Sequence, residues 1–159
     1  MKEAKRRFWE MAKTRVRMHS AEEHAEFHAA HFPKDEMPTS TAFVMEIGHT
    51  EGDDPEKGVL GLEISVNKDF FGEENTDLIP YAIEHEIYEA WVSSKRGLRA
   101  KDLKEGHLLA RMHQVEMAMK DGKAEKLLNF YISKNKNLKE EFEEAYEKAK
   151  KKILVKKSG

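Results

Sequence analysis

Hydrophobic and polar residues follow two different periodic patterns along this chain. From Lys2 to Phe32 hydrophobic residues recur at intervals of three and four with no Gly or Pro among them, which predicts an N-terminal amphipathic helix over residues 1–32. Over residues 41–67 the period changes to two, which predicts two strands separated by a polar loop that contains Gly and Pro. The alternating hydrophobic positions are Phe43, Met45, Ile47, Leu60, Leu62, Ile64 and Val66. Since one exposed loop joins the strands, we expect them to pair antiparallel.

The rest of the chain has helical patterns. Thr76 or Asp77 can cap a helix that carries Pro80 in its first turn, and this helix is predicted over residues 77–95. Three further helices are predicted within residues 102–157, the first of them ending at an Asp-Gly pair. The order of helix, strands and helices predicts an α+β fold, mainly helical, with a small antiparallel β-sheet packed on the second predicted helix.

Length and composition narrow the class of protein. The 159 residues predict a single domain over 1–159. The net charge of −2 argues against nucleic acid as the main partner, and the absence of Cys excludes disulfides, thiolate nucleophiles and Cys-bound zinc. No apolar run approaches the roughly 18 residues of a membrane span, and the charged first segment does not look like a signal peptide, so we expect a cytoplasmic protein with no membrane partner. Phosphate-binding glycine loops and the Gly-x-Ser-x-Gly motif of serine hydrolases are absent from the sequence.

The most informative segment is the sequence LIPYAIEHEIYEAWV, residues 78–92. On a helix it is apolar on nearly every face, which predicts burial, yet His85 and Glu89 lie in the middle of one apolar face. A buried carboxylate costs several kcal/mol unless it is paired or bound to a metal, so these two residues need a partner. Because they are four residues apart, both side chains point to one place, and Glu86 lies beside it.

Residues 85–89, His-Glu-Ile-Tyr-Glu, resemble the His-Glu-x-x-His helix of the zincin metallopeptidases, in particular the gluzincin branch. In that branch an edge strand before the motif lines the substrate cleft, which the resemblance places at Gly58–Val66. A later helix supplies the third zinc ligand, which corresponds here to residues 102–120. This sequence departs from the family at Glu89, where the family has His, and His113 on the later helix restores a set of two His and one carboxylate.

The resemblance implies a zinc-dependent hydrolase that acts on peptides or proteins. Zn²⁺ held by His85, Glu89 and His113 would lower the pKa of a bound water and polarise the scissile carbonyl. Glu86 would be the general base that takes the proton of the water and passes it to the leaving amine. An extended peptide would be held by strand addition at the edge of the sheet.

Two other classes of function fit parts of the pattern. Two His and one carboxylate also describe the iron site of non-haem oxygenases. The residues three positions before His85 and His113 are Ala82 and Ala110, so these histidines lack the Glu-x-x-His pattern of di-iron helical bundles. In the third hypothesis the chain is a helical binding module without catalysis, or has a structural metal site, and His85 and Glu89 form a polar seam between helices.

Several residues near the motif have secondary roles in these hypotheses. Glu116, one turn after His113, could be a fourth ligand or accept a hydrogen bond from a ligand histidine. His107 and Tyr88 could stabilise an oxyanion, although His107 points about 120° away from His113 on a helix and is a poor partner for it as a ligand. One helix face collects a row of histidines that could bind a metal or pack near the cleft: His24, His28 and His31.

Overall fold

A three-stranded sheet with helices on both of its faces forms the centre of the molecule. The computed structural model describes residues 13–31, 41–47, 61–96 and 100–158. The strands are β1 (Lys13–His19), β2 (Ala42–Ile47) and β3 (Gly61–Asn67). The helices are α2 (Ala21–His31), α3 (Lys68–Phe71), α4 (Ile79–Arg96), α5 (Ala100–Lys120), α6 (Ala124–Lys134) and α7 (Lys139–Ser158), with 3₁₀ turns at Glu73–Leu78 and Lys136–Leu138.

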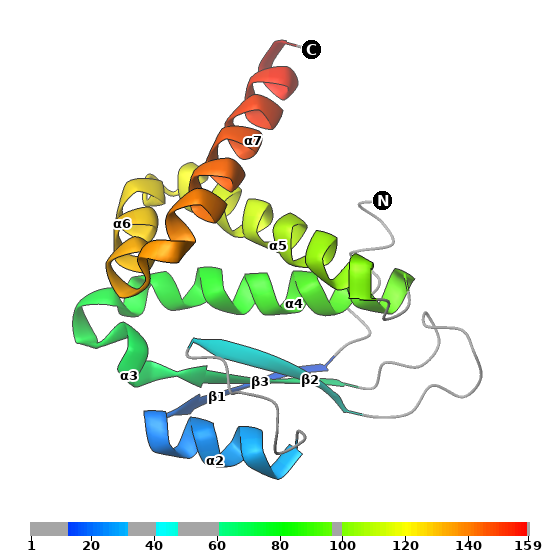
Figure 1. Cartoon of the computed structure of the whole chain (residues 1–159), viewed down its shortest axis with the longest axis vertical. Coiled ribbons are helices and arrows are strands. Elements are labelled where there is room, and N and C mark those ends of the chain that lie inside the picture. The colour runs from blue at the N-terminus through cyan, green and yellow to red at the C-terminus, as the bar shows by residue number, and fades with distance from the viewer. Residues whose placement is uncertain (1–12, 32–40, 48–60, 97–99, 159) are drawn as a thin grey trace.

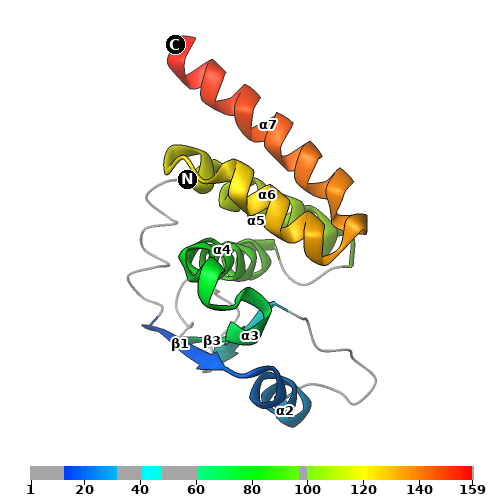
Figure 2. The ribbon, with the colours of Figure 1, turned by 90° about the vertical axis from the view of Figure 1, so that its left-hand side faces the viewer.

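The elements lie in layers (Figures 1 and 2). Helix α2 covers one face of the sheet and α4 the other, α5 packs on α4, and α7 crosses α5 and projects away from the body. Ile64 and Val66 of β3 are buried in the core together with Phe71 and Leu78, which come after β3 in the chain. The core between β3 and α4 therefore fixes the position of the helix that carries the His-Glu-x-x-Glu sequence.

Strand β3 lies at the centre of the sheet, in the order β1-β3-β2. It pairs parallel with β1 and antiparallel with β2. Its polar residues Glu63, Ser65 and Asn67 are buried like its hydrophobic ones because α2 covers that face. The expectation that Gly58–Val66 is an edge strand is therefore wrong for the part described, from Gly61 onward, and among the described strands β2 is an edge instead.

The topology of the sheet differs in part from the prediction. The strand pair at residues 41–67 is present and is antiparallel, but the whole sheet is mixed because β1 adds to it in parallel. The mainly helical character with a small sheet is confirmed, and the helices after β3 begin and end within a few residues of the predicted positions. No helix among the described residues combines the length and apolar character needed to cross a membrane.

Of the predicted N-terminal helix over residues 1–32, the part over Lys13–His19 is wrong, whereas the part over Ala21–His31 is helical. Residues Lys13–His19 form a strand. Thr14, Val16 and Met18 alternate with basic residues there, and this period of two is typical of a strand and not of a helix. A new helix begins after Ser20 with a capping box: Ser20 Oγ accepts from the N–H of Glu23 at 3.2 Å, and Glu23 Oε1 accepts from the N–H of Ser20 at 3.0 Å.

Loss of this cap should destabilise the fold measurably. We expect Ser20→Ala to lower the free energy of unfolding by about 1 kcal/mol, because the N–H of Glu23 in the first turn of α2 loses its acceptor, Ser20 Oγ. Urea denaturation of the purified protein measures the difference. Glu22→Ala, an exposed change in the same turn, is the matched control and should have a smaller effect. Equal stability of Ser20→Ala and the wild type would contradict the role of the cap.

Candidate metal centre

Two histidines and one carboxylate converge between α4 and α5. They are His85 and Glu89 of α4 and His107 of α5, and one donor atom of each lies within 4.8 Å of the donor atoms of the others. His85 Nε2 is 3.2 Å and His107 Nδ1 is 3.7 Å from the same oxygen, Oε2 of Glu89. The two imidazole rings meet edge to face with their centroids 4.9 Å apart. Among the described residues, this is the group of His and acidic side chains that could hold a metal ion.

The register of a helical hairpin brings His107 to Glu89. Helices α4 and α5 run antiparallel and are separated by a short break between Arg96 and Ala100. In such a hairpin, residues equally far from the break lie opposite each other. Glu89 and His107 satisfy this condition, so the two side chains face one another across the interface.

His85 is the buried member of the group. Its side chain is 6% exposed, and burial lowers the pKa of His85 to about 4, so the ring is neutral at pH 7. Its Nε2–H donates to Glu89, which leaves Nδ1 as a bare lone pair. Among the buried side-chain polar atoms that the structure describes, this Nδ1 alone lacks a hydrogen-bond partner. A neutral imidazole suits metal ligation, and the nitrogen of this ring that faces Glu89 is Nε2.

Glu89 and His107 carry opposite charges. Burial raises the pKa of Glu89, but hydrogen bonds from His107 and His85 outweigh it and lower that pKa to about 2. Hydrogen bonds to Glu141 and then to Glu89 raise the pKa of His107 to about 9. Without a metal, His107 is therefore an imidazolium between two carboxylates, and a cation that binds there must displace its proton.

Glu86 follows His85 in the chain and has a strongly altered pKa. Burial, and then the negative charge of Glu89, raise the pKa of Glu86 to about 8. The positive charges of Arg111 and His107 act in the opposite direction but are weaker. Its carboxyl group is thus held protonated at pH 7. A cation bound nearby would favour the carboxylate, the form that accepts a proton.

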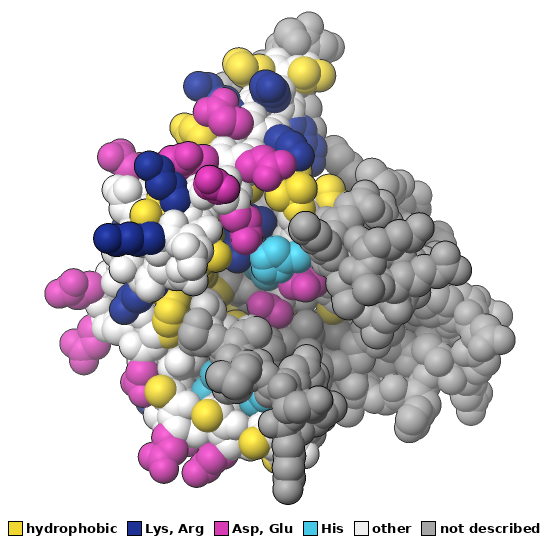
Figure 3. All heavy atoms as spheres, in the orientation of Figure 1, with side chains coloured by type: hydrophobic (Ala, Val, Ile, Leu, Met, Phe, Trp, Pro, Cys, Tyr) yellow, Lys and Arg dark blue, Asp and Glu magenta, His cyan; other side chains and the backbone are white. Residues whose placement is uncertain are grey.

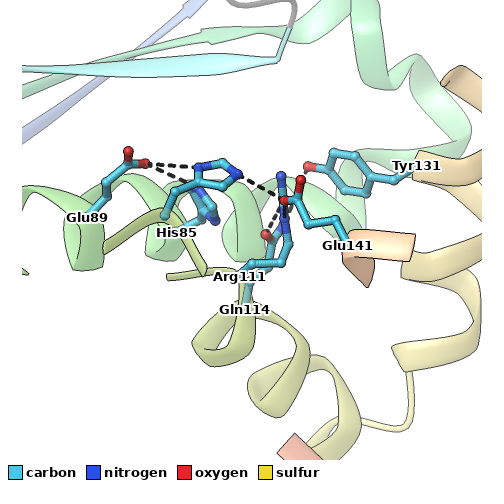
Figure 4. A network of polar contacts seen from close by, with 7 residues as sticks. His85, Glu89, Arg111, Gln114, Tyr131 and Glu141 are labelled. Atoms are coloured by element: carbon cyan, nitrogen blue, oxygen red, sulfur yellow. Dashed lines mark hydrogen bonds and ion pairs between the residues drawn. The ribbon is translucent and has the colours of Figure 1, made fainter. Parts of the chain in front are cut away.

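A polar network extends from the group to the last helix (Figure 4). Glu141 of α7 accepts hydrogen bonds from His107 Nε2 at 2.9 Å and from Arg111 Nε at 2.8 Å. Arg111 also donates to Gln114 Oε1 at 2.7 Å, and Gln114 donates to the hydroxyl of Tyr131 at 3.4 Å. The network joins the candidate metal centre to α5, α6 and α7.

His113, the expected third ligand, does not join this group. Its Nε2 lies 3.1 Å from Oε2 of Glu84, and its ring stacks on Tyr88 at 4.7 Å between centroids. His113 and His107 are separated by six residues of one helix, which places them about 120° and about 9 Å apart. The helix hairpin therefore presents His107 to Glu89 and His113 to Glu84, and Tyr88 packs on His113.

The other secondary candidates also lie elsewhere. Glu116 is buried and faces α7, where its carboxylate is 3.3 Å from Lys152 Nζ, with Lys120 Nζ at 3.6 Å, so it is not brought to the group as a fourth ligand. His24 and His28 are buried on the opposite side of the sheet, and His24 Nδ1 lies 2.8 Å from Ser65 Oγ. The side chain of His31 lies outside the described residues. His24 and His28 pack between α2 and the sheet.

The group can be reached from solvent. The side chain of His107 is 40% exposed and that of Glu89 is 27% exposed, whereas His85 forms the buried floor. In the space-filling view, histidine atoms reach the surface near the middle of the visible face beside acidic side chains (Figure 3). A tetrahedral metal ion held by these three donors would keep one position open for a water or a substrate atom.

Comparison of the chain with protein-family models, curated proteins and solved structures finds no match.

Proposed function

We propose that this protein is a zinc-dependent hydrolase of the zincin type, with His85, Glu89 and His107 as the metal ligands. The observation that carries the proposal is the convergence of two imidazoles and one carboxylate within 4.8 Å, with Glu86 next to His85 in the chain. This ligand set has the composition of catalytic zinc sites and keeps one position open.

Each residue has a definite task in the proposed reaction. Zinc, when bound, supplies a Lewis acid that activates water and polarises a carbonyl group. Glu86 takes a proton from the attacking water and returns it to the leaving group. The buried His85 excludes water from one side of the centre, and Glu89 offsets the charge of the cation. Arg111 holds positive charge near Glu86 and so favours its ionised form.

A peptide is the substrate class that the position of the sheet favours. Strand β2 lies at an edge of the described sheet and contacts α4, the helix that carries His85 and Glu89. An extended peptide that pairs with β2 on the side away from β3 would run alongside this helix. Such backbone pairing is largely independent of the peptide's side chains, so we propose broad sequence specificity.

One observation favours a second candidate, a polar seam without catalysis. His107 already bridges two carboxylates, Glu89 at 3.7 Å and Glu141 at 2.9 Å, and this ion-pair cluster can lock α4, α5 and α7 together with no metal. A protein of this kind would bind its partner through another surface. The two candidates differ in whether zinc is stoichiometric and whether peptides are cleaved.

The test is zinc content and cleavage measured on the same preparation. We expect protein purified without a histidine tag to bind one zinc per chain and to cleave a denatured protein or a peptide library. A chelator should abolish cleavage, and zinc should restore it, because the reaction depends on the metal. Absence of zinc binding at micromolar concentrations would favour the polar seam. One zinc per chain without cleavage would indicate a structural metal site.

A further inference from the structure

A carboxylate on the last helix contacts the candidate centre from outside. Glu141, in the first turn of α7, accepts from His107 Nε2 at 2.9 Å. The other ring nitrogen of His107, Nδ1, faces Glu89 at 3.7 Å. The two nitrogens therefore have different partners. An imidazole that donates one N–H to a carboxylate presents the lone pair of its other nitrogen, which becomes more basic, to a metal.

Glu141 is itself held in place. Arg111 Nε donates to the same oxygen, Oε1, at 2.8 Å, and the guanidinium lies over the ring of Phe142 at 4.3 Å. Phe142 is fully buried and stacks on Tyr131 with ring centroids 4.8 Å apart. A planar guanidinium fixed by an aromatic ring and by Gln114 gives the carboxylate a defined direction toward His107.

On the basis of the proposed zinc site, we infer that Glu141 is a positioning residue that fixes the tautomer of His107 and makes metal affinity depend on the docking of α7. The helix docks through the buried residues Phe142, Ala145 and Ala149. Since Glu141 reaches His107 only when α7 is docked, metal binding and docking favour each other. Zinc should accordingly slow amide exchange in α7, which contributes no ligand.

The experiment compares Glu141→Gln with Glu140→Gln. Glu140 is exposed on the same turn, so its replacement removes the same charge without touching His107. Zinc affinity is measured by competition with a chromophoric chelator, with ¹⁵N NMR of the histidine side chains in the zinc-loaded protein. We expect Glu141→Gln to weaken zinc binding by roughly 10- to 100-fold and Glu140→Gln to leave it unchanged. In the wild type, zinc should be bound by Nδ1 of His107, with the proton on Nε2.

The NMR measurement separates positioning from a merely structural role, because loss of stability alone would not move the proton between the ring nitrogens. Glu141→Asp retains the charge on a shorter side chain, should bind zinc with intermediate affinity, and provides the comparison if Glu141→Gln does not fold. Zinc affinity in Glu141→Gln equal to the wild type, or ligation through Nε2, would overturn the inference and leave the zinc site standing. Absence of zinc binding by the wild type would overturn both the site and this inference.

Discussion

His107→Ala should abolish stoichiometric zinc binding, as should His85→Ala, because each removes one of only three donor side chains. The remaining pair cannot hold the ion against water at micromolar concentrations. Zinc should therefore raise the unfolding temperature of the wild type and leave that of both variants unchanged, since a ligand stabilises a fold only through binding to the folded state. At a zinc concentration of about 100 times Kd, the stabilisation lost is about 2.7 kcal/mol.

His113→Ala is the matched control for this prediction. Both histidines lie on α5, and each contacts a glutamate of α4 through a ring nitrogen, His107 with Glu89 and His113 with Glu84. We expect His113→Ala to retain one zinc per chain, as measured by elemental analysis after dialysis. Loss of zinc in His113→Ala together with retention in His107→Ala would refute the ligand set taken from the structure and restore the one predicted from sequence.

Glu86→Gln should reduce the rate of peptide cleavage by roughly 10²-fold or more and leave zinc content unchanged. Gln has nearly the volume of Glu and can still donate and accept hydrogen bonds, but it cannot take a proton from water. The raised pKa of Glu86, about 8, has burial as its main cause, and the neutral amide suits the same buried position. Folding of the variant should therefore be close to that of the wild type.

The control for the base is Glu84→Gln, two residues earlier on the same helix. Glu84 contacts His113, which lies outside the metal centre, so this variant should cleave peptides at nearly the wild-type rate. Initial rates with zinc present, compared with rates in a chelator, provide the measurement. A Glu86→Gln protein that cleaves as fast as the wild type would exclude Glu86 as the general base.

The parts of the fold that could be predicted from sequence have strong local signals. Pro80 marks the start of α4, and Gly122 marks the end of α5. The expected caps, Thr76 and Asp77, lie instead within the 3₁₀ turn Glu73–Leu78 that leads into α4. Strand β1 is seven residues long with basic residues at alternate positions, so its period of two is weak beside the neighbouring helical pattern. The capping box at Ser20 and Glu23 is the one local signal that separates the strand from α2.

The site could be predicted in its α4 half only. His85, Glu86 and Glu89 are related by the geometry of a single helix, which sequence spacing determines. The third ligand depends on how two helices align. The angle between His107 and His113 on α5 does not indicate which of the two faces Glu89. Their distances from the break between α4 and α5 favour His107, because His107 and Glu89 are equally far from it. The sequence does not indicate a role for Glu141 at the site, since its helix is rich in Glu and Lys and has the pattern of a solvated surface helix.

The parallel pairing of β1 with β3 also has a consequence for how the chain is made. Lys13 pairs with Gly61, 48 residues later, and β3 is the only described strand next to β1. Ribosomes add about 5 to 20 residues per second, so β3 is synthesised roughly 2 to 10 seconds after β1, the strand with which it pairs. During this time the backbone groups of β1 are open to other chains, including the β3 of a neighbouring copy. Among the described strands, the first to be synthesised is thus the one with the longest opportunity to exchange between molecules.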